Sequence, residues 1–348
     1  MRRDELLGEP IKHLELNKIH GLADLLEAFH YTSFQSRNLA KCLDVYKNLL
    51  EDEERVTVFM GLSGAMVPAG LRKVIVDMME HRLIDVLVST GANLYHDFAE
   101  AHAPTHFIGS QHADDGELRD LNIDRIYDTF ADETKFKGLD IRISEIVDSL
   151  EYRGYSTREF LEILGSHIDD ENSILGKASR LGIPIFCPAI NDSSIGIGLA
   201  EYYVRKKKDH DDMATIDSIR DVYEIAQINE KSKKTGVVYV GGGTPKNYIQ
   251  QLEVVLKSLG MVSGSREGHD YALQITTDDP KWGGLSGCTF EEAQSWGKIS
   301  RDATKATCYI DATIGLPLLV GALIEGLREK RKPLKFHWNG DELKGPLD

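Results

Sequence analysis

The stretch EEAQSWGKIS, residues 291–300, places a lysine directly after a bulky aromatic residue and a glycine. Two acidic residues precede Lys298 on what the pattern predicts to be a helix. A lysine can act as a nucleophile only when its amine is neutral, which requires dry surroundings or a nearby cation to lower its pKa. Trp296 is suited to form such a dry wall. The stretch therefore fits a nucleophilic lysine, and the alternative is an ordinary surface lysine on a helix.

A second set of residues suited to ligand binding follows the predicted strands, in loops rich in glycine, serine and threonine. Such loops let backbone N–H groups approach a phosphate, with a helix N-terminus behind them. Taken singly, each loop is equally well a turn or a helix cap. Together they favour a ligand of dinucleotide size. The loops are GLSGAMVPAG (61–70), TGAN (90–93), INDSSIGIG (190–198), GGGTPK (241–246), TTDDPKWGGLSG (276–287) and DATIG (311–315).

Two aspartates, Asp192 and Asp311, directly follow predicted strands. An acid in that position can hold a ribose hydroxyl of a bound dinucleotide. Either aspartate could instead be a simple N-cap of the next helix. The residues leave both interpretations open.

The strands that carry these loops are short apolar runs that alternate with helical patterns. Continuous runs of valine and isoleucine are typical of strands covered on both faces, as in a parallel sheet. Their alternation with helices predicts a Rossmann-like, doubly wound α/β fold with a mostly parallel sheet. The predicted strands are 55–61, 84–90, 183–189, 236–242, 271–277 and 307–312.

The domain organisation follows from the same patterns. Residues 14–52 repeat apolar positions at helical spacing, so we predict an N-terminal helical extension over 1–52. The remainder, 53–348, is predicted to be the catalytic α/β domain, compact with the extension as a single unit. The first 15 residues or so and the tail DELKGPLD are expected to be mobile.

Composition excludes several classes of protein. The 348 residues carry a formal net charge of -15, which argues against a nucleic-acid partner and is compatible with a cationic small-molecule substrate. The start has no apolar signal segment, and the longest apolar run, 315–327, is too short for a membrane span and contains Glu325. We therefore expect a cytoplasmic protein without membrane contact.

Cysteine and histidine spacing indicates no metal. No C-x-x-C pair occurs, and the cysteines fit buried small side chains in a reducing compartment. Three histidines lie close together in sequence, but Pro104 interrupts any helix between the last two, and we favour structural or hydrogen-bonding roles over metal ligation. The cysteines are Cys42, Cys187, Cys288 and Cys308; the histidines are His96, His102 and His106.

Several segments carry a resemblance to a known family. SWGKI (295–299), followed by YIDATIGLPLLV (309–320), resembles the C-terminal signature of the deoxyhypusine synthases. Four further segments match that family in the same order, so the likeness covers nearly the whole chain. They are LLEAFHYTSFQSRNLA (25–40), IDVLVSTGA (84–92), IPIFCPAINDSSIG (183–196) and GGGTPK (241–246). Within the family, the chain is most similar to the bacterial deoxyhypusine synthase-like proteins.

The resemblance implies an NAD-dependent transfer. NAD takes a hydride from the carbon beside the secondary amine of spermidine, and a lysine captures the resulting imine. The aminobutyl group then passes to an acceptor amine, and the same NADH reduces the new imine. Lys298 matches that lysine, at a point where the cofactor loops of the sheet are expected to converge. Trp296 is expected to wall the site, Gly297 to leave room for the substrate and Glu292 to hold a substrate ammonium.

The resemblance also implies which residues contact NAD. They form a first loop, a second loop, an aspartate after the third strand and the ends of the last three strands. The residues are Gly64, Ala65, Met66, Val67 and Pro68; Thr90, Gly91 and Ala92; Asp192; Gly242; Thr277; and Asp311 with Ala312. The first loop differs from the family in sequence, so its contacts are expected to come from the backbone.

The substrate positions depart from the family. Tyr95 and His96 stand where the family has two glutamates, and Asn247 and Gln251 stand where it has a histidine and an asparagine. Family aspartates are replaced at three more places. Each unpaired ammonium in a dry pocket would cost several kcal/mol, so the resemblance implies an altered substrate pocket. The last three replacements are Ile197, Trp282 and Leu285.

Taken together, the sequence predicts an NAD-dependent aminobutyl-type transferase whose acceptor is a small amine, giving a homospermidine-type product, rather than a protein lysine. The pocket is predicted to include Glu292, Trp296, Asn247, His96, Tyr95 and Leu285. The family implies a homotetramer with sites at subunit interfaces, where residues 1–20 of one subunit block a neighbour's entrance. The alternatives are an NAD-binding sensor or scaffold without catalysis and an NAD-dependent amine dehydrogenase.

Overall fold

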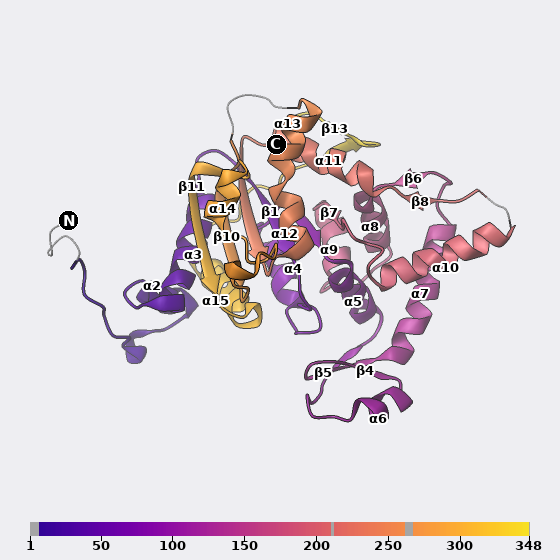
Figure 1. Cartoon of the computed structure of the whole chain (residues 1–348), viewed down its shortest axis with the longest axis horizontal. Coiled ribbons are helices and arrows are strands. Elements are labelled where there is room, and N and C mark those ends of the chain that lie inside the picture. Colours follow the sequence, from indigo (N-terminus) through magenta and orange to yellow (C-terminus); the bar gives the residue numbers. More distant parts are fainter. Residues whose placement is uncertain (1–6, 210–211, 262–266, 348) are drawn as a thin grey trace.

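A parallel sheet of six strands forms the centre of the computed structural model, which describes residues 7–209, 212–261 and 267–347 (Figure 1). The strand order is β11-β10-β9-β1-β2-β7, and neighbouring strands pair in parallel. This order confirms the predicted doubly wound fold. The strands are β1 (Val56–Leu62), β2 (Val86–Ser89), β7 (Ile185–Phe186), β9 (Lys234–Val240), β10 (His269–Thr276) and β11 (Ile299–Tyr309).

Strand β1 shows how the sequence covers both faces of the sheet. All seven of its residues are buried. Because successive side chains of a strand point to opposite faces, Val58 and Met60 pack with one layer of helices, whereas Phe59 packs with the other. In β9 the same alternation sends Val238 to the first layer and Tyr239 to the second. A run without polar interruptions is therefore the expected signature of these central strands.

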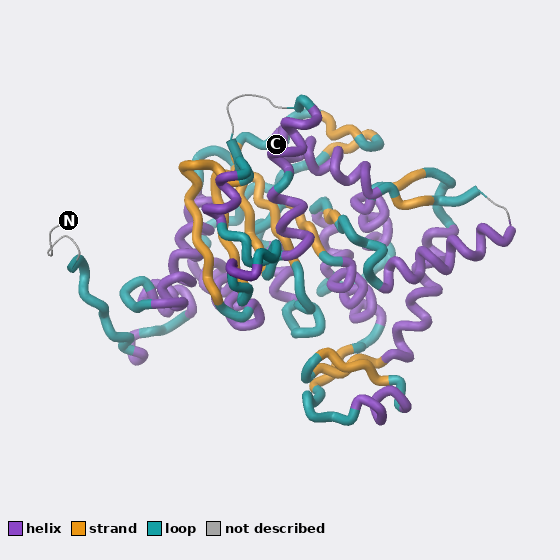
Figure 2. Tube along the Cα trace, in the orientation of Figure 1, coloured by secondary structure: helices purple, strands orange, loops and turns teal. Residues whose placement is uncertain are grey.

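Helices cover both faces of the sheet, as the tube in Figure 2 shows. The helices packed in the larger core are α2 (Leu22–Phe29), α3 (Phe34–Glu51), α4 (Arg72–Glu80), α5 (Gly91–His102), α7 (Glu133–Asp148), α8 (Thr157–Ser166), α9 (Ile174–Leu181), α10 (Ser194–Asp209) and α15 (Ala312–Gly326). The opposite core contains α11 (Ser218–Lys231), α12 (Gly243–Gln250), α13 (Leu252–Leu259) and α14 (Phe290–Ser295).

The predicted N-terminal helical region consists of a 3-10 turn at Leu16–Lys18 followed by α2 and α3. Helix α3 packs against β10 and β11, and α2 packs against α15. The backbone N–H of Ala23 in α2 also donates to Glu325 at the end of α15 (2.9 Å). These helices thus form part of the layer that covers the sheet. Residues 1–6, part of the segment predicted to block a neighbouring site, lie outside the described residues.

Some strands differ from the prediction. Strand β7 has only two residues, whereas β11 is eleven residues long and begins directly after Lys298. The first half of β11 is only partly buried because the strand forms the edge of the sheet, so its sequence lacks an apolar run. A small antiparallel sheet of order β3-β5-β4 was also not predicted, and Figure 1 shows β4, β5 and α6 away from the central sheet.

The remaining elements are short. They are β3 (His106–Ile108), α6 (Asp115–Asp120), β4 (Ile123–Ile126), β5 (Thr129–Asp132), β6 (Gly154–Tyr155), β8 (Thr215–Ile216), the 3-10 turn Pro280–Trp282, β12 (His337–Asn339) and β13 (Glu342–Lys344). Within the part of the chain that the structure describes, no helix has the length and apolar character needed to cross a membrane.

Candidate functional site

The order of the strands locates the place where a ligand is expected. Strands β1 and β9 are neighbours, and the chain proceeds outward from them in opposite directions. Ligands of open α/β sheets bind at such a switch point, outside the carboxyl ends of the strands. Ser63, directly after β1, joins the two loops here: its Oγ donates to the carbonyl of Val240 (3.0 Å) and accepts from the N–H of Gly242 (2.8 Å). Sequence reasoning missed Ser63, although a hydroxyl directly after a strand was a usable signal.

The first predicted cofactor loop is held by Asn93, a buried residue in the first turn of α5. Its Oδ1 accepts from the N–H groups of Met66 (3.0 Å) and Val67 (3.3 Å), and its Nδ2 donates to the carbonyl of Gly64 (2.8 Å). Nδ2 also lies 3.2 Å from Oγ1 of Thr90 in the second loop. Asn93 thus holds the conformation of both loops. It also occupies two backbone N–H groups that were predicted to bind a ligand. Asn93 was not predicted as a site residue.

The second loop requires glycine because another loop approaches it closely. A Cβ at Gly91 would lie 2.4 Å from Oγ of Ser193. Asp192, the exposed residue before Ser193, is therefore carried next to the start of α5. That Asp192 and the loop Thr90–Ala92 contact one ligand stays a prediction.

The first and last loops meet at an open cavity of about 740 Å³. Its volume is within the range of small-molecule and cofactor sites. Asp311 also has the capping role left open by the sequence, since its Oδ1 accepts from the N–H of Thr313 at the start of α15 (2.8 Å). The lining includes Ala65, Met66, Val67, Pro68, Arg72, Glu100, His106, Asp128, Asp311 and Thr313.

A buried lysine at the end of the GGGTPK loop (241–246) was also missed by sequence reasoning. Lys246 in α12 is completely buried, and its Nζ donates to Oε1 of Gln274 (2.9 Å) and to the carbonyls of Ser286 (3.2 Å) and Cys288 (2.5 Å). Burial, together with the positive charge of nearby Lys298, lowers the pKa of Lys246 to about 8. Its place in the GGGTPK loop was the available signal.

The predicted nucleophile does not lie on a helix. Helix α14 ends at Ser295 and is closed by a Schellman motif, in which the N–H of Lys298 bonds to the carbonyl of Ala293 (3.1 Å) and that of Gly297 to Gln294 (2.9 Å). Gly297 has φ 67°, a left-handed conformation that glycine adopts without strain. The glycine between Trp296 and Lys298 is therefore explained by the turn of the backbone, and not by room for a substrate.

Within one chain, Trp296 does not enclose the lysine. The indole is 67% exposed and Lys298 is half-buried, with Nζ 5.6 Å from the indole ring. The carbonyl of Lys298 accepts from the N–H of His269, the first residue of β10, so the backbone of Lys298 lies at the amino ends of the strands. The expectation that the cofactor loops converge on Lys298 is thus not met by a single chain.

The other predicted substrate residues are dispersed. Tyr95 is 2% exposed, and its hydroxyl lies 2.8 Å from Oδ1 of Asp140, so the structure does not support substrate contact by Tyr95. His96 bonds to His106, and Asn247 lies on α12 with Nδ2 3.4 Å from Oε1 of Gln251. The other members of the set are exposed: Glu292, Leu285, Ile197 and Trp282, together with Thr277 of the cofactor set.

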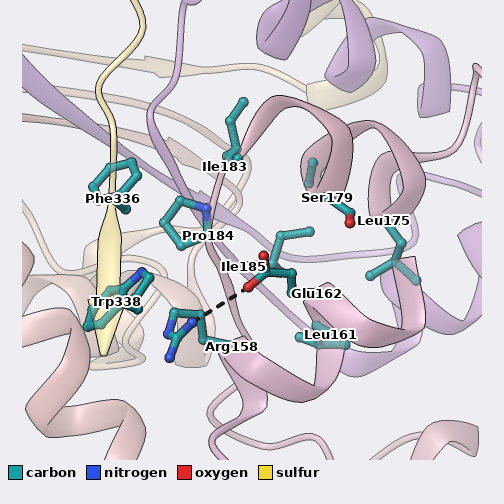
Figure 3. Close-up of a pocket in the computed structure, with 12 residues that line it drawn as sticks. Arg158, Leu161, Glu162, Leu175, Ser179, Ile183, Pro184, Ile185, Phe336 and Trp338 are labelled. Carbon is teal, nitrogen blue, oxygen red and sulfur yellow. Dashed lines mark ion pairs between the residues drawn. The ribbon is translucent and has the colours of Figure 1, made fainter. Parts of the chain in front are cut away.

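Two further observations bear on alternative sites. A small, partly open cavity of about 60 Å³ lies beside Arg158 and Trp338, with Pro184 at the amino end of β7 (Figure 3). It is small, lies at the end of the strand where ligands of such sheets are not found, and its arginine is paired with Glu224 (2.7 Å). Among the described residues, no group of three or more histidine, cysteine, aspartate or glutamate side chains is arranged to hold a metal ion.

Comparison with known proteins places this geometry in a family. The deoxyhypusine synthase family model matches residues 24–323. The chain is 49% identical to "Probable deoxyhypusine synthase 2" of Methanosarcina acetivorans, with 93% of each chain covered. It is 40% identical to the deoxyhypusine synthase-like protein of Chlorobaculum parvum (92% and 91% covered) and 37% identical to that of Coxiella burnetii (96% and 94% covered).

A solved structure shares the fold of this chain. A crystal structure of an Entamoeba histolytica protein that carries the deoxyhypusine synthase name superposes with a TM-score of 0.61 at 18% identity, covering 92% of this chain and 98% of that one. At that identity the likeness concerns the fold alone. The family model and the full-length relatives carry the assignment: this chain belongs to the deoxyhypusine synthase family.

Proposed function

We propose that this protein is an NAD-dependent aminobutyl-type transferase that acts through an imine on Lys298 and delivers its group to a small amine. Membership of the deoxyhypusine synthase family supports a transferase of this kind. The proposal rests on the Schellman motif that closes α14 and includes Lys298. The Schellman motif fixes a lysine at a defined place after α14, within electrostatic range of the buried amine of Lys246.

The residues present fit a dinucleotide. The cavity of about 740 Å³ joins the first loop to Asp311, and glycines line the adjacent strand ends, where a Cβ at Gly242 would lie 2.4 Å from Cα of Ser286. When bound, NAD would supply the hydride acceptor for the donor amine. Because Asn93 occupies the N–H groups of Met66 and Val67, other groups in the cavity must hold the phosphates.

An altered substrate is supported by the side chains at two positions where the family has aspartates. Trp282 is 76% exposed and Leu285 is 51% exposed, and neither can pair with an ammonium as a carboxylate would. The relatives also support an altered substrate. Methanosarcina acetivorans has two proteins named probable deoxyhypusine synthase, and this chain is 49% identical to the one numbered 2 but 38% identical to the one numbered 1. We infer that the second type uses a different amine pair.

We further propose that a second copy of the chain completes the site in a homotetramer. Large exposed apolar side chains lie beside Lys298, at the end of β11 and in the segments that follow β10 and β11, and exposed apolar surface of this kind marks an interaction site. Such a partner would cover the indole of Trp296 and supply the dry wall that one chain lacks. The residues of this surface are Trp282, Leu285, Trp296, Tyr309 and Ile314.

The test is a screen of polyamines and diamines with NAD, with products identified by mass. We expect a secondary amine product without net formation of NADH, and borohydride should trap an adduct on Lys298. Lys298→Arg should abolish transfer while NAD still raises the melting temperature, because arginine stays protonated and forms no imine. Lys305→Arg, a change in β11 that keeps a positive charge beside Gln294, is the matched control.

Each alternative has its own signature in that screen. Net NADH with release of an aldehyde would identify an amine dehydrogenase. NAD binding without turnover of any amine would support a sensor or scaffold. Full transfer activity in Lys298→Arg would show that Lys298 is not the residue that forms the imine.

A further inference from the structure

Three titratable side chains on α5 and β3 form a continuous hydrogen-bonded chain. Nδ1 of His106 lies 2.6 Å from Oε1 of Glu100, and Nε2 of His106 lies 2.8 Å from Nδ1 of His96. The same carboxylate oxygen accepts from the backbone N–H groups of Thr105 (2.9 Å) and His106 (2.8 Å). Burial opposes ionisation of Glu100, but these bonds hold its pKa below the usual value. The carboxylate is therefore ionised and fixed in place.

The ionised carboxylate determines where the hydrogens of the two imidazoles lie. Because Glu100 only accepts, the hydrogen of His106 is on Nδ1. When His106 is neutral, its Nε2 is an acceptor, so the donor between the rings is Nδ1–H of His96. Nε2 of His96 then carries a free lone pair. A proton that reaches this atom can be passed on by moving the Nδ1 hydrogen to His106.

The surroundings disfavour a positive charge on His96, whereas His106 lies against the carboxylate of Glu100. Burial lowers the pKa of His96 to about 4, as does the neighbouring His106. The rings of Tyr95 and Phe136 flank His96 at 6.3 and 5.7 Å between centroids. A proton delivered to His96 therefore moves to His106, which faces the carboxylate of Glu100.

Other charged groups nearby are engaged or lie across the cavity. Asp140 on α7 accepts from the hydroxyl of Tyr95 (2.8 Å). Arg72 lines the same cavity as His106 but pairs with Asp97 (2.6 Å) and Asp170 (2.7 Å). Asp128 also lines that cavity.

The chain of bonds runs along one face of α5 toward the predicted cofactor loops. Ala92, His96 and Glu100 are spaced by four residues, so they share a face, and helical side chains lean toward the N-terminus. Ala92 belongs to the second loop, while Glu100 and His106 line the 740 Å³ cavity. His96 is partly exposed, and no described residue hydrogen-bonds to its Nε2. His96 itself is not among the residues that line that cavity, but α5 begins directly after the carboxyl end of β2.

We propose that His96, His106 and Glu100 form a proton relay that deprotonates the donor amine. This inference rests on the proposed transferase function. A donor ammonium gives its N–H proton to Nε2 of His96, and the Nδ1 hydrogen of His96 moves to Nε2 of His106. The lone pair left on the donor nitrogen can then form the C=N bond when the adjacent carbon gives up its hydride, which NAD, when bound, would accept. The proton remains on the His106–Glu100 pair until the product amine takes it back.

The kinetic test compares His96→Gln, His106→Gln and Glu100→Gln with His102→Gln, a histidine of the same helix whose ring bonds only to the carbonyl of Phe98. The Glu100→Gln variant keeps an oxygen for the two backbone N–H groups. With NAD and spermidine, or the donor that the screen identifies, formation of reduced nicotinamide is followed by stopped flow. We expect a loss of roughly 100-fold in His96→Gln near neutral pH, typical of a general base, with recovery as rising pH deprotonates the donor. The His102→Gln control should match wild type, and an equal loss at every pH would overturn the relay.

A second measurement does not depend on activity. In protein labelled with nitrogen-15 at histidine, we expect the His106 ring to carry hydrogen on Nδ1 in the neutral form and to take up the first proton of the pair. The Glu100→Gln variant should weaken that protonation. Protonation of His96 before His106 would refute the relay. If wild type forms no reduced nicotinamide with any amine, the transferase proposal fails, and this measurement still decides whether the relay exists.

Discussion

Replacing Lys246 with methionine should change the free energy of unfolding by an amount that depends on pH. The side chain is completely buried, and burial lowers its pKa from 10.5 to about 8. Methionine has a similar length and no charge. It also removes the donor that three oxygen atoms share, on Gln274, Ser286 and Cys288, so the variant should be less stable at every pH.

The pH dependence follows from the lowered pKa. Below about pH 8 the amine is protonated in the folded and the unfolded chain, so pH has no effect through this group. Between about pH 8 and 10.5 the unfolded chain keeps the proton that the folded chain releases, and stability rises with pH. A difference of about 2.5 pKa units (10.5 minus 8) corresponds to roughly 3 kcal/mol. Wild type should therefore gain roughly 2–3 kcal/mol over Lys246→Met between about pH 7 and pH 10.

The assay is urea unfolding of both proteins at these two pH values. Subtracting the variant from wild type removes the contribution of the other titrating groups. Lys257→Met, which removes an exposed lysine from α13, controls for the loss of one positive charge. A stability difference between wild type and Lys246→Met that is the same at both pH values would refute the assignment of a lowered pKa to this buried amine.

Three further predictions concern the backbone around the site. Gly297→Ala should lower the free energy of unfolding in urea by roughly 1–2 kcal/mol, because the residue has a left-handed φ of 67°. Gly297→Asn should lower it less, because asparagine tolerates this conformation better. Equal losses in the two variants would contradict the Schellman explanation. Asn93→Ala should lower the free energy of unfolding by on the order of 2–4 kcal/mol, because two N–H groups and a carbonyl lose their hydrogen-bond partner. It should also remove the NAD-dependent rise in melting temperature. An unchanged rise would show that the loop keeps its conformation without Asn93. Gly91→Ala should lower the melting temperature, because the added Cβ would clash with Ser193. The double variant with Ser193→Gly should recover part of this loss. If it recovers none, the loss does not come from a clash with Ser193.

Much of the fold could be read from the sequence because its signals are local. Buried parallel strands need apolar side chains on both faces, so β1 and β9 contain the apolar runs VFMGL (58–62) and GVVYV (236–240). Connections from strand to helix need glycine and polar caps, so the loops after the strands were identifiable. The Schellman glycine and the capping aspartate Asp311 are likewise local features. The edge strand β11 was predicted too short because exposure removes the apolar pattern on which such predictions depend.

What the sequence alone determined is therefore the alternation of elements, the family and the positions of candidate loops. The tertiary structure decided which of these residues meet. Asn93 binds N–H groups that the sequence had suggested for a ligand, and Lys246 is buried against carbonyls 40 and 42 residues away in sequence. His96 on a helix contacts His106 on a strand. The backbone of Lys298 lies at the amino end of β11, away from the cofactor loops. Hydrogen bonds and burial between distant segments depend on how whole layers pack, and that information is not contained in any short stretch of the chain.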